Sequence, residues 1–118
     1  MGKIRQFETG ATRDSSEGKN YYGGFISPEF LVAFGDYMTI HRKQSDGNLR
    51  DPDNWKKGMP PRECFESLLR HVMDIWLEMD GLESRDGLDE AFGGAMFNLQ
   101  ALWFNLNKEK KNEDNKTK

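Results

Sequence analysis

The large apolar side chains of this chain concentrate in three segments, where they recur at intervals of three and four residues. This spacing puts them on one face of an α-helix, and it predicts helices over residues 28–42, 61–80 and 88–107. The first two have clear starts at Ser27-Pro28 and Pro60-Pro61, because Ser caps free amides and Pro needs no donor in the first turn. We therefore expect an all-α domain with three main helices.

Two of these helices carry a second stripe beside the apolar one. In the helix over 61–80, the expected core stripe is Phe65, Leu68, Leu69, Val72, Ile75, Trp76 and Met79, and a polar stripe contains Cys64, Ser67, His71, Asp74 and Glu78. In the helix over 88–107, the expected core stripe is Leu88, Phe92, Ala95, Leu99, Leu102 and Leu106. A stripe of smaller residues beside it leaves room for a neighbouring helix, or a ligand, to approach the backbone: Ala91, Gly94, Asn98, Ala101 and Asn105.

The length of 118 residues allows one domain. Residues 1–24 are polar and glycine-rich without apolar periodicity, so they predict an irregular arm. The helical domain then spans 25–107. Residues 108–118 are charged and rich in Asn, which predicts a disordered tail.

Charge and cysteine content exclude some classes of protein. A net charge of −3 argues against binding duplex nucleic acid, which requires a strongly basic face. Cys64 is the single cysteine, so an intrachain disulfide or a thiolate metal cluster is not expected. Residues 1–6 lack an apolar leader, and no stretch reaches the ~18 apolar residues of a membrane span. We expect a cytoplasmic protein that does not bind membranes.

A long polar loop separates the first two predicted helices. It is rich in turn dipeptides such as Asp46-Gly47 and Asp51-Pro52, and loops of this length are usually functional or disordered. Trp55 lies in it. A Trp in a polar loop either pins the loop to the core or stacks on a planar ligand, and both alternatives remain open.

The polar stripe of the second helix offers candidate catalytic residues. His71 and Asp74 lie one turn apart and point the same way, which suits a general base or a metal ligand as well as an ordinary surface pair. Glu63 and Glu66 match the first Glu-x-x-Glu pair of helical nucleotide pyrophosphohydrolases, where carboxylates gather around Mg²⁺. With Asp74 they form the candidate ligand set for Mg²⁺ or Mn²⁺.

Several motifs together resemble those of a bacteriophage family, the dATP/dGTP diphosphohydrolase N-terminal domain family. The shared motifs cover most of residues 8–106 and comprise Glu-Thr-Gly-Ala-Thr-Arg-Asp at 8–14, Ser27-Pro28, His41-Arg42, Asp46-Gly47, Asp-Asn-Trp-Lys-Lys-Gly at 53–58, Arg70-His71 with Asp74, and Phe97-Asn98. The resemblance implies a chain that binds purine deoxynucleotides and releases diphosphate or phosphate. Many members of the family carry histidines where this chain has Ala91 and Gly94.

This resemblance gives the first hypothesis for function. Trp55 is expected to stack on the base, His71 and Asp74 to supply a base or metal function, and basic side chains to hold phosphates. The full expected binding set is Arg13, Lys19, Arg42, Asn54, Trp55, Lys56, Arg70 and Asn98.

Two other functions remain open from the sequence. The chain could be a non-catalytic sponge for a nucleotide or a cyclic-nucleotide signal, which needs the binding residues and no metal. It could also be an interaction module in a helical oligomer. Three helices with a long loop make a thin core, so a homodimer or higher homo-oligomer is expected in each case.

Overall fold

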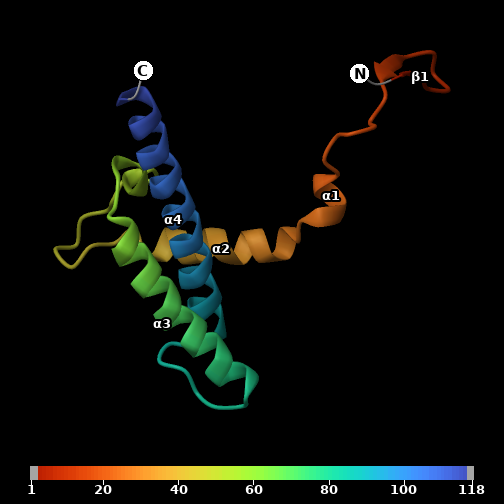
Figure 1. Ribbon diagram of the computed structural model, residues 1–118. Coiled ribbons are helices and arrows are strands. Elements are labelled where there is room, and N and C mark those ends of the chain that lie inside the picture. The colour runs from red at the N-terminus through yellow and green to blue at the C-terminus, as the bar shows by residue number, and fades with distance from the viewer. Residues whose placement is uncertain (1–2, 117–118) are drawn as a thin grey trace.

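The computed structural model describes residues 3–116, which form four α-helices, one short 3-10 helix and a two-stranded sheet. Helices dominate the arrangement (Figure 1), so the expected helical character is confirmed. The fold is mainly α and not purely all-α, because the N-terminal arm contains strands. A fourth helix, one turn long, also lies in the arm.

The N-terminal arm has more regular structure than its composition predicted. Strands β1 (Ile4–Gln6) and β2 (Thr12–Asp14) pair antiparallel, and helix α1 (Tyr22–Phe25) follows. Gly10 lies in the hairpin turn with a φ of 92°, a conformation that favours glycine. Strands of three residues are too short to show an alternating pattern, so periodicity could not reveal them. Figure 1 shows the arm extending away from the other helices.

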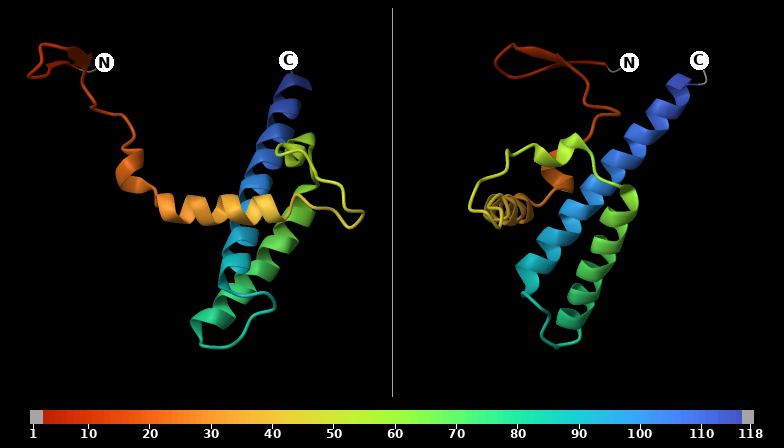
Figure 2. Two further views of the ribbon diagram at one scale, coloured as in Figure 1. Left: turned by 180° about the vertical axis from the view of Figure 1, so that it is seen from behind. Right: turned by 90° about the vertical axis from the view of Figure 1, so that its left-hand side faces the viewer.

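Helix α2 (Pro28–Ile40) begins where the sequence predicted. The Ser27 hydroxyl accepts a hydrogen bond from the Phe30 amide at 3.1 Å, and Pro28 takes the first helical position. The helix crosses α4 on the side away from α3 (Figure 2). Its Tyr37 ring lies against Gly93 of α4, where an added Cβ would overlap the ring. The glycine therefore sets how closely α2 approaches.

Helices α3 (Pro61–Met79) and α4 (Leu88–Lys116) form an antiparallel pair joined by residues 80–87 (Figures 1 and 2). The pair packs through the polar stripe of α3 and the small stripe of α4, whose buried members are Cys64, Asp74, Ala91, Gly94, Asn98, Ala101 and Asn105. The two helices are close at Gly94, because an added Cβ there would overlap the His71 ring.

The expected core stripes of α3 and α4 are not the core of the chain, and this corrects the sequence prediction. Trp76 of α3 is 59% exposed, and Leu99 of α4 is 55% exposed. Phe65, Leu69, Val72 and Met79 on α3, and Phe92 and Leu106 on α4, are exposed as well. The reason is steric: two helices approach closely only through small side chains, so the large ones are turned outward.

Helix α4 runs to Lys116 and includes most of the segment for which the charged composition predicted disorder. Lys and Glu have high helix propensity, which favours continuation of the helix without any apolar contact. Residues 117–118 of that segment lie outside the described residues. Within residues 3–116, no helix combines the length and apolar character that a membrane crossing requires.

We expect Gly94→Ala to destabilise the chain by about 1–3 kcal/mol, because the new methyl group would force His71 and α3 away from α4. Gly35→Ala is the matched control. Gly35 lies within α2 with open space around it, so the same substitution should stabilise the helix by about 0.5–1 kcal/mol. Urea denaturation followed by circular dichroism measures both. Equal effects of the two substitutions would contradict the close approach at Gly94.

Candidate functional site

A cavity of about 480 Å³ opens between the end of α2, the loop over residues 41–60 and α4. We call it the loop pocket. Its lining combines aromatic rings with cationic, amide and carboxylate groups, among them Tyr37, Arg42, Arg50, Asp51, Asn54, Trp55 and Phe97. Three residues of the expected binding set therefore lie together here, namely Arg42, Asn54 and Trp55.

Two arginines fasten the loop to the end of α2. Arg42 Nε donates to the Arg50 carbonyl at 2.8 Å, and Arg50 Nη1 donates to the His41 carbonyl at 2.7 Å. In the part of the chain that the structure describes, the other nitrogens of both guanidinium groups have no hydrogen-bond acceptor. Both side chains line the loop pocket, so their remaining donors are available to an anion there.

Trp55 lies on the 3-10 helix η1 (Asn54–Lys57) and meets α4. Its ring packs edge-on against Phe104, with centroids 5.1 Å apart, and Lys56 Nζ lies 5.8 Å from the Trp55 ring centroid. Just beyond η1, the Met59 amide donates to Asn105 Oδ1 of α4 at 3.0 Å. Trp55 thus pins the loop to α4 and also lines the loop pocket.

The other wall of the loop pocket is fixed by His41 and Tyr37. His41 Nε2 lies 2.8 Å from Glu90 Oε2, and the His41 and Tyr37 ring centroids are 4.1 Å apart. Burial raises the pKa of Tyr37, and the Glu90 carboxylate raises it further. The Tyr37 hydroxyl is therefore protonated at neutral pH and can donate a hydrogen bond.

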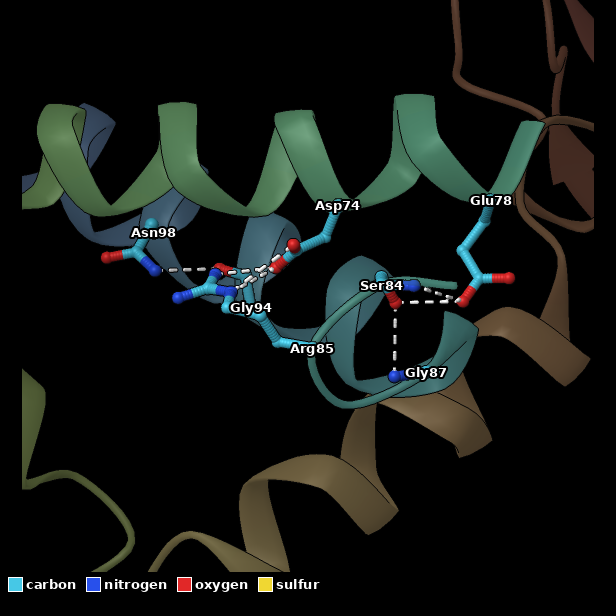
Figure 3. Close-up of polar contacts among 7 residues, drawn as sticks. All are labelled: Asp74, Glu78, Ser84, Arg85, Gly87, Gly94 and Asn98. Atoms are coloured by element: carbon cyan, nitrogen blue, oxygen red, sulfur yellow. Dashed lines mark hydrogen bonds and ion pairs between the residues drawn. The ribbon is translucent and has the colours of Figure 1, made fainter. Parts of the chain in front are cut away.

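The predicted catalytic pair lies elsewhere, between α3 and α4. Asp74 is buried, and its carboxylate accepts hydrogen bonds from Arg85 Nε at 3.1 Å and from Arg85 Nη2 at 2.5 Å (Figure 3). Hydrogen bonding to Arg85 holds the pKa of Asp74 below its ordinary value. Arg85 comes from the loop between α3 and α4, so this pair ties that loop back onto α3.

The same loop is further ordered by Ser84. Its hydroxyl donates to Glu78 Oε1 at 2.8 Å and accepts from the Gly87 amide at 3.1 Å, immediately before α4 begins (Figure 3). These bonds hold Arg85 beside Asp74.

His71 packs its ring against Gly94 of α4, and its Nδ1 is buried without a hydrogen-bond partner among the described residues. Burial lowers the pKa of His71, and the positive charge of Arg85 lowers it further. The imidazole is therefore neutral at pH 7. His71 lines the helix interface and not the loop pocket. A side chain at position 94 would overlap its ring, so a His at each of positions 71 and 94 does not fit this packing.

The five remaining expected binding residues do not line the loop pocket: Lys56 lies beside the Trp55 ring on η1, and the other four are dispersed. Arg13 and Lys19 lie on the arm, no described element of which contacts the other helices. Arg70 is exposed on α3. Asn98 is buried, and its Nδ2 donates to the Gly94 carbonyl at 2.8 Å, which satisfies it within α4. None of these four lines the loop pocket.

The expected metal ligands are not brought together. Glu66 pairs with Arg62 at 3.2 Å, and Asp74 lies eight residues farther along α3, about 12 Å by helical rise. Glu63 is exposed. Across residues 3–116, no group of three or more His, Cys, Asp or Glu is placed to hold a metal ion. Glu63, Glu66 and Asp74, as the structure places them, therefore do not form one Mg²⁺ or Mn²⁺ centre.

Arg50 and Arg85 were not singled out from the sequence. The signal for Arg50 was its place beside Asp51-Pro52 in the same long loop as Trp55. The signal for Arg85 was its place as a lone cation in the short connection that follows α3. The polar stripe of that helix carries the carboxylate of Asp74. Neither position has periodic neighbours, so only the folded loops reveal their partners.

Replacing His71 by Gln should make stability less dependent on pH. The folded-state pKa of His71 lies below its ordinary value of about 6.5, so the unfolded chain takes up a proton first as pH falls. The contribution of His71 is full above about pH 6.5 and is lost as pH falls through the folded-state pKa. Urea denaturation between pH 5 and 8 measures this loss.

His41→Gln is the control, because the exposed His41 lies outside the α3–α4 interface. In the His41→Gln variant, the loss of stability at low pH that is due to His71 should persist. A His71→Gln curve parallel to that of the unsubstituted chain would show that His71 is not held neutral by burial.

Comparison of the chain with models of known protein families, with curated proteins and with solved structures finds no match. The function must therefore be inferred from the residues of the loop pocket and from the helix interface.

Proposed function

We propose that the loop pocket binds a purine nucleotide, or a small molecule derived from one, and holds it without metal-dependent hydrolysis. The observation that carries the proposal is the pairing of two arginines with aromatic rings around one cavity. A volume of about 480 Å³ is within the range of roughly 300–1,000 Å³ typical of small-molecule sites.

Arg42 and Arg50 are the proposed phosphate ligands. A guanidinium group presents donors in a planar fork that matches phosphate oxygens, and its charge persists at every physiological pH. One nitrogen of each arginine is already bonded to the backbone, which fixes the side chains before a ligand arrives. Fixed donors lose less conformational entropy on binding than mobile ones do.

Trp55, Tyr37 and Phe97 supply flat apolar surface for a nucleobase. Stacking of a base on an aromatic side chain contributes about 1–3 kcal/mol and tolerates different bases. Asn54 adds an amide that can both donate to and accept from a base edge. The preference for a purine is supported by the motif resemblance to the phage family.

Binding, and not hydrolysis, is proposed because the carboxylates are not arranged as a metal centre. Asp74 is engaged by Arg85 in an interface apart from the loop pocket, and Glu63 and Glu66 lie on the surface of α3. The proposed role is sequestration of the ligand.

Calorimetric titration with dATP and dGTP, with and without MgCl₂, tests the proposal, followed by anion-exchange analysis of the recovered ligand. We expect saturable binding that does not require Mg²⁺, and recovery of intact nucleotide. Release of diphosphate or phosphate in the presence of Mg²⁺ or Mn²⁺ would show an enzyme instead. Absence of binding heat, together with no nucleotide-induced shift in melting temperature, would refute a nucleotide site.

Arg50→Gln should weaken nucleotide binding by about ten-fold or more, since a charge-assisted hydrogen bond contributes about 1.5–3 kcal/mol. Arg70→Gln is the matched control, because Arg70 is an exposed arginine of the expected binding set outside the loop pocket. The Arg70→Gln variant should bind nucleotide with unchanged affinity. Calorimetry on both variants distinguishes the loop pocket from the α3 surface, and a larger loss for Arg70→Gln would assign the phosphates to α3.

A further inference from the structure

By helical rotation, the outward apolar stripes of α3 and α4 lie on the same side of the helix pair. In an antiparallel helix pair, residues rotated by the same angle from the contact stripe of each helix lie on the same side of the pair. This holds for Phe65, Leu69, Val72 and Trp76 of α3 and for Leu99, Trp103 and Leu106 of α4. We call these seven residues the outer face. Trp76 and Trp103 are 59% and 66% exposed.

The surface area of the chain is larger than a separate chain of this size normally exposes. It exposes 9636 Å², whereas a folded monomer of 13.7 kDa exposes about 6,600 Å² by the usual scaling. The excess is about 3,000 Å² per chain, part of it due to the extended arm. Obligate homodimers bury roughly 2,000–5,000 Å² in total, so two chains have ample surface for such an interface.

We propose that a second copy of this chain covers the outer face, with the two α3 helices antiparallel about a two-fold axis near the middle of α3. The pairing of two α3–α4 hairpins would form a four-helix arrangement with the large apolar residues at its centre. The proposal is independent of nucleotide binding in the loop pocket, which lies against other surfaces of the chain.

Charge at the ends of α3 favours a second copy in this orientation. Arg62, which also pairs with Glu66 of its own chain at 3.2 Å, and Asp80, the residue that caps the C-terminal end of α3, lie eighteen residues apart. This is five full turns, so helical rotation places both on the side of α3 that borders the outer face. The Arg62 guanidinium lies 5.4 Å from the Phe65 ring centroid, at the edge of that face. Antiparallel pairing places Arg62 of each copy opposite Asp80 of the other. A parallel arrangement would oppose like charges.

Sedimentation equilibrium of the full chain tests the association directly, and we expect a mass of twice 13.7 kDa. Trp76→Glu should shift the chain to monomer, because it puts a charge into the apolar outer face. Val32→Glu is the control: Val32 is 64% exposed on α2, away from the outer face, and this variant should remain a dimer. A monomeric unsubstituted chain would overturn the proposal.

A charge exchange tests the orientation without altering the apolar residues. Arg62→Glu alone and Asp80→Arg alone should each weaken the dimer by roughly ten-fold, because each creates two repulsive contacts. The double variant Arg62→Glu, Asp80→Arg should restore the original affinity. Circular dichroism checks that each variant keeps its helical content.

A third set of variants separates the outer face from the arm as the contact surface. Tyr22→Ser and Phe25→Ser change exposed residues of the arm, and the dimer should persist in both. Loss of the dimer in these variants but not in Trp76→Glu would assign the contact to the arm.

Additive weakening by the two charge substitutions, with no restoration in the double variant, would overturn the antiparallel pairing.

Discussion

The close approach of α3 and α4 determines which side chains of these two helices are buried and which are exposed. Gly94 brings the backbone of α4 against the His71 ring, and Ala101 continues the narrow contact farther along the helix. Two helices this close leave no room for large side chains between them. Phe65 and Trp76 therefore lie outside, and polar groups such as Asp74 lie inside, where they need partners. Arg85, in the loop between α3 and α4, donates hydrogen bonds to Asp74.

The sequence was informative about helices and much less so about what covers them. The starts at Ser27 and Pro61 follow from local chemistry, and the structure confirms both. The inward faces of α3 and α4 could not be predicted, because a periodicity of 3.6 residues defines a stripe without naming its neighbour. An apolar stripe usually faces the core of its own chain. Here Gly93 and Gly94 let α2 and α3 approach α4 closely, so the large apolar residues face outward. The effect of these glycines depends on contacts with residues distant in sequence.

The candidate site, too, could be predicted from the sequence only in part. The sequence grouped Asn54 with Trp55, and the two are neighbours on η1 that line the loop pocket. It also grouped His71 with Asp74, but it could not show that their common direction is toward α4 and not toward a cavity. Arg50 joins the loop pocket only through the fold of the loop, whose turn depends on bonds such as that from the Asn48 amide to Asp46 Oδ1 at 2.9 Å. Polar residues at helical spacing can thus hold an interface together while the proposed ligand site forms from irregular backbone.

Helix α4 meets a different neighbour on two of its sides between Leu88 and Leu106. One side meets α2 at Gly93, a second meets α3 at Gly94 and Ala101, and the third carries Leu99 and Trp103 of the outer face. With the proposed second copy on the outer face, no side of α4 would be left without a contact, and such a helix has few positions at which a random substitution is neutral. Evolutionary drift should therefore be slowest in α4, and fastest in the N-terminal arm, whose described strands and short helix α1 contact none of the other helices.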